Sequence, residues 1–111
     1  KRVIAVHQPF TYSRTKTLLD DFAEVLQIAD ITVLSEIMGS REKNIYNIYA
    51  RDLAEKIPGC VWFPTFEKIA AHVVSIAEDG DLIITLGCGD VNKCAKLIVE
   101  KLKDQPNAAN G

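Results

Sequence analysis

A polar, aromatic and basic stretch at residues 8–16 holds the side chains best suited to chemistry. It reads Gln-Pro-Phe-Thr-Tyr-Ser-Arg-Thr-Lys and links a short apolar run to an amphipathic helix pattern. Arg14 and Lys16 fall at or near the first helical turn, where the helix dipole disfavours cations. A bound anion would restore the balance, because both cations and free backbone N–H groups would face it. The stretch predicts an anion-binding loop, and the alternative is a solvated basic loop.

A second loop, Gly87-Cys88-Gly89-Asp90, precedes the last helix pattern. Glycines allow the backbone to approach a ligand closely, and N–H groups are free where a helix starts. The loop is a weak dinucleotide fingerprint, because Asn92 stands where a third glycine belongs and the preceding strand is the fourth, not the first. Two interpretations stay open. One is a structural turn, and the other is a site wall made of Gly87, Gly89 and Asp90.

The cysteines and histidines do not form a metal or nucleophile pattern. Three cysteines without a Cys-x-x-Cys pair fit reduced thiols. We expect Cys60 and Cys94 to be small core residues, and Cys88 to be the exposed one. Neither His7 nor His72 has a metal-ligand spacing, so we expect no metal site, with His7 in the core and His72 on the surface.

Composition excludes several classes of protein. The chain has 111 residues, 48% of them hydrophobic, and a net charge of −2 from 13 basic and 15 acidic residues. This predicts one domain with a single core and argues against a nucleic-acid or membrane surface. The longest apolar run is far shorter than the ~20 residues of a membrane span. With no leader and no initiator Met, the chain is expected to be a fragment of a longer cytoplasmic protein.

Four apolar runs alternate with four helix patterns. Strands are predicted at 3–7, 31–37, 60–63 and 82–86. Helices are predicted at about 15–29, at 48–56, between the N-cap Thr65 and Gly80, and at 91–103. The first helix would start at Ser13 or in a Thr17-x-x-Asp20 capping box. Its predicted apolar face consists of Leu18, Phe22, Val25, Leu26 and Ala29. The alternation predicts a three-layer α/β/α, Rossmann-like fold with a mostly parallel sheet over residues 1–103, and a frayed tail at 104–111.

Right-handed crossovers give the strands the order 3-2-1-4, with a switch point between the first and fourth strands. The loops at 8–14 and 87–90 follow those two strands. They are therefore predicted to be neighbours that face one ligand. The connection at 38–47 is long for an α/β protein and is either a functional loop or a surface excursion.

The stretch Gln8-Pro9-x-x-Tyr12-Ser13-Arg14-Thr15 resembles a signature of the Mur ligase family, Gln-Pro-His-x-Tyr-Thr/Ser-Arg-Thr. It is most similar to the UDP-N-acetylmuramate–L-alanine ligases of that family. Asp20-Asp21-Phe22 and Arg41-Glu42-Lys43 also agree, as does Gly-Asp-Leu-Ile-Ile-Thr-Leu-Gly-x-Gly-Asp at 80–90. These stretches occur in the family's order and spacing and cover nearly the whole chain.

The resemblance implies that the chain is the C-terminal domain of a three-domain, ATP-dependent ligase of peptidoglycan precursor synthesis. Such a parent joins L-alanine to UDP-N-acetylmuramate through an acyl-phosphate, with ATP and Mg²⁺ held mainly by the N-terminal and central domains. The family's Gly-Lys-Thr/Ser loop does not occur here. We therefore expect no catalytic residue and no cofactor in this domain alone, and no turnover by it. The alternative is a stand-alone nucleotide- or phosphate-binding module without catalysis, or an interaction domain.

The resemblance also implies which residues meet substrate. Tyr12 and Arg14 correspond to residues that contact the incoming amino acid and the muramoyl substrate, and Thr11 and Phe10 lie in the same loop. Phe10 stands where the family has His, whereas His7 stands where it usually has Phe. Three interpretations of the exchange stay open, which are a shifted amino-acid preference, a degenerate paralogue and no functional consequence.

Overall fold

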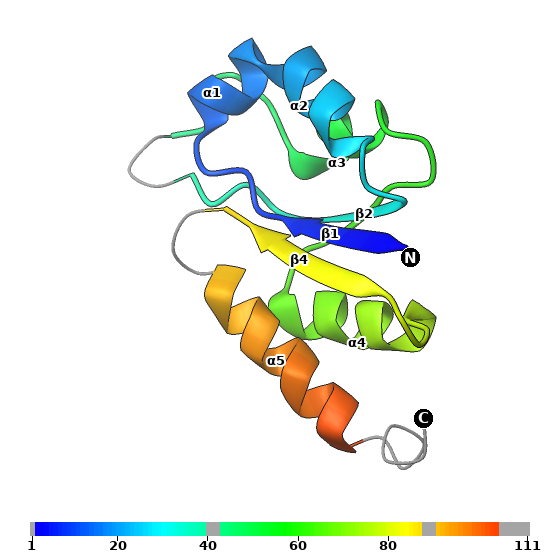
Figure 1. The fold of residues 1–111 in the computed structure, drawn as a ribbon. Helices are drawn as coiled ribbons and strands as arrows, with labels where there is room; N and C mark the ends of the chain where they lie inside the picture. Colours follow the sequence, from blue (N-terminus) through cyan, green and yellow to red (C-terminus); the bar gives the residue numbers. More distant parts are fainter. Residues whose placement is uncertain (1, 40–42, 88–90, 105–111) are drawn as a thin grey trace.

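Four parallel strands form one sheet between two layers of helices in a computed structural model that describes residues 2–39, 43–87 and 91–104 (Figure 1). The strands are β1 Val3–His7, β2 Ile31–Ser35, β3 Val61–Phe63 and β4 Leu82–Leu86. Their order is β3-β2-β1-β4, so β1 is central and pairs with β2 on one side and β4 on the other. The predicted fold class and strand order are confirmed.

Helices cover both faces of the sheet (Figure 1). On one face lie α1 Tyr12–Thr17, α2 Leu19–Leu26 and α3 Ala50–Ala54, and on the other lie α4 Phe66–Ile76 and α5 Val91–Asp104. The described residues thus contain five helices where four were predicted. The first predicted helix is divided at Leu18, whose φ of −108° and ψ of 22° are not helical. Asp20 and Asp21 then lie in the first turn of α2, where the dipole favours acidic residues.

Several predicted boundaries were wrong. Strand β2 ends at Ser35 and not at 37, because the Glu36 carboxylate accepts hydrogen bonds from the N–H groups of Ile37 and Ala50. Helix α3 is shorter than 48–56, and α4 ends at Ile76, before the turn that contains Gly80. Helix α5 extends through residue 104, and residues 105–111 lie outside the described part.

The core has two parts, one on each side of the sheet. Ile4 and Val6 of β1 pack with the inner faces of α4 and α5, where Ile69, Ala70 and Val73 are buried as predicted. On the other side, Leu34 packs with Leu26 and Leu53. The continuous apolar run of β1 follows from this arrangement, because a central parallel strand is covered on both faces.

The thiols and one histidine complete the core. Burial raises the pKa of both Cys60 and Cys94 to about 11, which makes them poor nucleophiles. Cys88 lies outside the described residues. His72, predicted at the surface, is half-buried, and its ring centroid lies 5.1 Å from that of Phe63. That prediction was wrong because the helix face that carries His72 lies beside β3, and the imidazole packs on the Phe63 ring of that strand.

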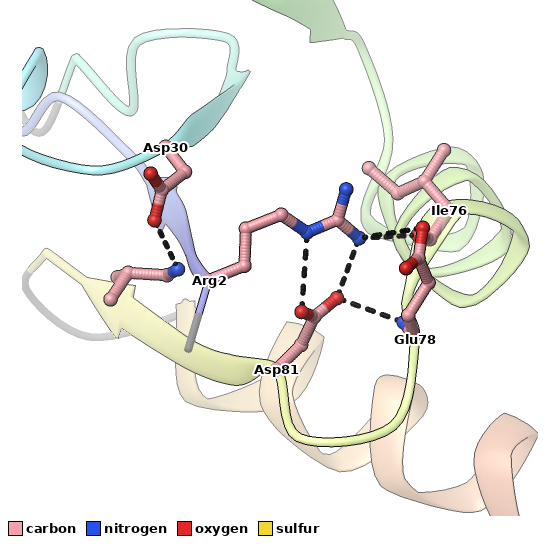
Figure 2. Close-up of polar contacts among 6 residues, drawn as sticks. Arg2, Asp30, Ile76, Glu78 and Asp81 are labelled. Carbon is pink, nitrogen blue, oxygen red and sulfur yellow. Dashed lines mark hydrogen bonds and ion pairs between the residues drawn. The ribbon is translucent and has the colours of Figure 1, made fainter.

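An ionic clamp holds the amino-terminal end of β1 to the α4–β4 connection (Figure 2). The Arg2 guanidinium donates to both carboxylate oxygens of Asp81, at 3.2 and 2.7 Å, and to the carbonyl of Ile76 at 2.9 Å. The same Asp81 carboxylate accepts from the Glu78 N–H at 2.8 Å. The hydrogen bond from Arg2 is the main cause that lowers the pKa of Asp81 below its ordinary value. The clamp therefore favours the folded state only while Asp81 is ionised.

Replacing Asp81 with Asn should lower the urea midpoint of unfolding at pH 7, because Arg2 and the Glu78 N–H lose an ionised acceptor. Since the folded-state pKa of Asp81 is lowered, its contribution is present above the ordinary value of 3.8 and is lost as pH falls through the folded value. The difference in urea midpoint between Asp81→Asn and the unsubstituted protein should therefore disappear at acidic pH.

Asp79→Asn is the matched control, because Asp79 is exposed in the same turn. Its midpoint should stay close to that of the unsubstituted protein. Equal losses in the two variants, or a gap that does not change with pH, would show that the clamp does not stabilise the fold.

Candidate functional site

The carboxyl ends of β1 and β4 lie side by side. The Gln8 N–H donates to the Leu86 carbonyl at 3.0 Å, which continues the pairing of the two strands past His7. The loop after β1 and Gly87 therefore start as neighbours, as the strand order predicted. Gly89 and Asp90, the other proposed wall residues, lie outside the described residues.

Gly87 is required by this close approach. Its φ is +147°, and a Cβ at this position would lie 2.9 Å from the Gln8 carbonyl oxygen. Contacts that short are not tolerated by backbone atoms, so any side chain would push the two strand ends apart. This supports the interpretation of Gly87 as a structural turn. It leaves the role of a site wall as a prediction.

A third segment supports the loop from its other side. The N–H groups of Met38 and Gly39 donate to the carbonyls of Pro9 and Phe10, each at 2.9 Å. The far end of the same connection is also held, because the Asn44 side chain exchanges two hydrogen bonds with the backbone of Ile48. The described ends of the 38–47 connection are thus anchored, which argues against a free surface excursion. Residues 40–42 are not described.

Helix α1 begins at Tyr12, with Thr11 as its N-cap, earlier than either predicted start. Thr11 has extended φ and ψ, and its hydroxyl accepts from the Arg14 N–H at 3.2 Å. Its carbonyl accepts from the Thr15 N–H at 3.1 Å and from the Thr15 hydroxyl at 2.6 Å. The predicted cap at Thr17 was therefore wrong. Thr11 serves as the N-cap, and Arg14 lies in the first turn with an exposed side chain.

The two cations of this segment do not share one location. Lys16 lines a separate groove with Asp52, Glu55 and Lys56, and Arg14 does not. Positions two apart on a helix point to different sides, since only residues three or four apart share a face. The prediction that Arg14 and Lys16 face the same anion is therefore not supported.

Tyr12 packs directly on the supporting segment. A Cβ at Gly39, whose φ is +83°, would lie 2.7 Å from Cε2 of Tyr12 and 3.0 Å from its hydroxyl oxygen. The ring is half-buried there, whereas Phe10 is 40% exposed. The predicted site residues therefore differ in setting. Arg14 and Phe10 are exposed to solvent, Tyr12 packs on Gly39, and the Thr11 hydroxyl caps the helix.

Two side chains at the end of β1 carry buried polar atoms. Gln8 is only 7% exposed, and among the described residues its Oε1 has no hydrogen-bond partner. Both ring nitrogens of His7 are likewise buried without a partner in the described part of the chain. Buried unpaired polar atoms are costly and call for an explanation. The sequence placed Gln8 in the predicted loop but did not identify it as a site residue, although a polar residue directly after a buried strand was a usable signal.

Burial lowers the pKa of His7, and a weaker interaction with the Leu86 backbone opposes the shift. Its ring lies 5.9 Å from that of Phe22, which places it in an apolar setting as a core histidine. His7 is therefore neutral near pH 7.

Among the described side chains of this edge, Arg14 is suited to binding a carboxylate. Arg14 presents a planar donor fork, which suits a carboxylate. Across residues 2–39, 43–87 and 91–104, no group of three or more His, Cys, Asp or Glu side chains is placed to hold a metal ion. Within those same ranges, no helix has the length and apolar character needed to cross a bilayer.

Comparison with known proteins found relatives that are named as ligases. No protein-family model matches the chain. It is 41% identical to a UDP-N-acetylmuramate–L-alanine ligase of Caldicellulosiruptor saccharolyticus and 40% identical to one of Acetivibrio thermocellus, over 91% and 97% of this chain. The enzyme of the same name from Mycolicibacterium smegmatis is 36% identical over 96% of the chain. The chain spans only 22–23% of the length of these relatives.

Replacing Gly39 with Ala should destabilise the protein through two separate effects. A left-handed backbone costs an L-residue roughly 1–2 kcal/mol, and the new methyl group would also displace the Tyr12 ring. Gly59 has a φ of +73°, and a Cβ added there would meet no atom within 4 Å, so Gly59→Ala isolates the backbone effect.

Urea unfolding should show a loss of about 1–2 kcal/mol for Gly59→Ala and a clearly larger loss for Gly39→Ala. Shifted Tyr12 ring resonances are expected in Gly39→Ala alone. Equal losses would mean that Tyr12 does not pack on Gly39 in solution.

Replacing His7 with Phe should remove a pH-dependent loss of stability. Because burial lowers the folded-state pKa of His7, stability is complete above the ordinary value of 6.5 and falls as pH decreases below it. Urea midpoints at pH 7.5 and 5.5 should therefore differ less in His7→Phe than in the unsubstituted protein.

His72→Phe is the control, since His72 also lies beside a phenylalanine ring. It should keep the original pH dependence. If His72→Phe removes that dependence and His7→Phe does not, the assignment of the buried neutral imidazole to His7 is wrong.

Proposed function

We propose, from the premise that this chain matches the C-terminal fragment of a Mur ligase, that it is the substrate-binding C-terminal domain of such an enzyme. The parent would be an ATP-dependent ligase that joins L-alanine to UDP-N-acetylmuramate. The observation that carries the proposal is the match itself, which is about 40% identical over about nine-tenths of the chain to enzymes of that name.

The geometry is consistent with this role. In α/β sheets, ligands bind at the carboxyl ends of the strands where the strand order reverses. Here that position lies between β1 and β4, and the loop that starts there leads to the exposed Arg14. A domain that presents one side of a site in this way needs other domains to complete it. ATP, which would supply the phosphoryl group, and Mg²⁺, which would neutralise charge on its phosphate oxygens, would be held mainly by the parent's N-terminal and central domains.

In the proposed reaction the muramoyl carboxylate would take the γ-phosphoryl group of ATP and release ADP, and the amino group of L-alanine would then attack the acyl-phosphate and displace phosphate. This domain would contribute by positioning the reactants when the domains close. The Arg14 fork would bind a substrate carboxylate, and Tyr12 would form a wall of the small amino-acid pocket, with Phe10 beside it. Thr11 would act by setting the start of α1, because its hydroxyl caps the helix.

The alternative, a stand-alone phosphate-binding module, has less support. Its main sequence feature was the glycine loop after β4, yet Gly87 is explained by its contact with the Gln8 carbonyl. A glycine that is needed for packing is no longer evidence for a phosphate.

The proposal is tested by ATP hydrolysis in the full-length parent with UDP-N-acetylmuramate and a panel of amino acids. Turnover with L-alanine is expected. Turnover with another amino acid only would assign a changed preference to the loop that carries Phe10. Absence of turnover in a folded parent would contradict the proposed activity.

In the same parent, Arg14→Ala should lower kcat/KM for L-alanine or for UDP-N-acetylmuramate by about 10–100-fold. This is the loss expected when one hydrogen-bonded charge contact is removed. Arg14→Lys should recover only part of the loss, because an ammonium group lacks the planar fork.

Lys68→Ala is the control, since Lys68 lies on α4, on the opposite face of the sheet. Its kinetics should be unchanged. Equal kcat/KM values for Arg14→Ala and the unsubstituted parent would remove Arg14 from the site.

A further inference from the structure

A short turn at residues 44–48 presents two apolar side chains to solvent. Ile45 and Tyr46 form its tip and are 78% and 38% exposed. The central positions of turns are normally occupied by Gly, Pro, Asn, Asp or Ser, because those residues suit the turn backbone. A β-branched and an aromatic residue break this preference, and the domain does not bury either of them. The residue types at the tip therefore indicate a contact with a surface outside this chain.

Two asparagines hold the turn in one shape. The Asn44 side chain accepts from the Ile48 N–H at 3.1 Å and donates to the Ile48 carbonyl at 2.8 Å. Ile48 is itself buried in the domain. Asn47 has a φ of +51°, in the left-handed region that asparagine tolerates better than most residues. The tip is thus carried by a closed and anchored turn, so binding through it would cost little conformational entropy.

The turn lies close to the proposed site. It belongs to the connection whose first residues, Met38 and Gly39, bind two carbonyls of the loop that leads to Arg14. The base of the turn is also near α1, because Asn47 and Ile48 line a groove of about 390 Å³ together with Lys16 of that helix. The tip is therefore placed beside the edge of the sheet where the proposed site needs other domains to complete it.

The small size of the tip indicates what kind of partner it fits. A stable interface between separate proteins buries about 800 Å² on each side, from roughly 20–30 residues. A large aromatic side chain buries only about 150–250 Å², so two side chains are too few to hold a second copy. They suffice between domains of one chain, because the tether gives a high effective concentration. The chain spans only 23% of the length of relatives that it matches, so such domains are available.

We propose that Ile45 and Tyr46 anchor this domain to another domain of the parent ligase. The partner surface would be an apolar hollow that takes both side chains, with an acceptor for the Tyr46 hydroxyl, which usually has a hydrogen-bond partner when it is buried. This contact would hold the edge that carries Arg14 against the rest of the site. The proposal rests on the proposed function only in taking the parent to be a multidomain ligase.

The proposal is tested by the reactivity of a thiol at the tip. Ile45→Cys should react with a maleimide more slowly in the full-length parent than in the 111-residue chain, with labelling of the unsubstituted proteins subtracted. A tip that is docked for nine-tenths of the time would react about tenfold more slowly. The parent is measured alone and with UDP-N-acetylmuramate, Mg²⁺ and a non-hydrolysable ATP analogue, since substrates close domains in many enzymes.

Ser75→Cys is the matched control, because Ser75 is exposed on α4, on the opposite face of the sheet. Its labelling rate should be the same in the two proteins. Equal rates for Ile45→Cys in the 111-residue chain and in the parent, with and without ligands, would overturn the proposal. Protection that depends on protein concentration would assign the tip to a second copy and would also overturn it.

A second substitution separates binding of the tip from simple covering of it. Tyr46→Asp, added to Ile45→Cys, should restore rapid labelling in the parent, because an apolar hollow does not accept a carboxylate. The urea midpoint of the 111-residue chain should stay unchanged in the same double variant, since both residues are exposed there. Protection that survives Tyr46→Asp, or a lowered midpoint in the 111-residue chain, would contradict a docking role.

These outcomes are distinguishable from a failure of the proposed ligase activity. Labelling needs no turnover, so slow labelling of the ligand-free parent supports the contact whether or not the parent joins L-alanine to its substrate. If the parent does not bind the ligands, the proposed function fails and the ligand-free rate alone decides. In that case a rate equal to that of the 111-residue chain overturns the contact as well.

Discussion

The pairing of β1 with neighbours on both sides is the constraint on which the structure depends. Its hydrogen bonds do not stop where the strand ends. At the carboxyl end, Gln8 continues the ladder to Leu86, and the carbonyls of Pro9 and Phe10 accept from the segment after β2. At the amino end, Arg2 is clamped to Asp81. One strand thereby sets the position of every loop that the proposed site uses.

The two ends of this strand are satisfied in different ways. At the amino end, the charged groups of Arg2 and Asp81 are paired, and the Val3 N–H donates to the Asp30 carboxylate (Figure 2). At the carboxyl end, buried polar atoms of His7 and Gln8 lack partners among the described residues. Paired charged groups stabilise the fold. Unpaired buried polar groups cost free energy, and they occur mainly at functional sites. The contrast supports placing the chemistry at the carboxyl end.

A chain that spans under a quarter of its relatives' length should carry surfaces that belong to contacts with the rest of the protein. The loop at residues 8–16 and the apolar groove lined by Val25, Ile84 and Leu86 are two such surfaces, and they differ in chemistry. The loop is polar and presents Arg14, as a site shared with small charged substrates requires. The groove is formed by aliphatic side chains, as packing against another apolar segment requires.

The sequence by itself determined the existence of the four strands, their order and the edge of the sheet at which the site is proposed. Continuous apolar runs and right-handed crossovers leave few topologies, and the N-cap at Thr65 was readable because no other residue there competes for the role. Only the tertiary structure decided which residue caps α1, because Thr11, Ser13 and Thr17 all have side chains that can cap a helix. Thr11 is the cap because the N–H groups of Met38 and Gly39 bind the loop that precedes it. The Tyr12–Gly39 contact and the burial of Gln8 could not be predicted either, because both depend on residues that are distant in the sequence. Hydrophobic periodicity shows which face of a helix or strand is apolar, but it does not show whether another element covers that face. Val25 was therefore predicted to be buried, and it is exposed.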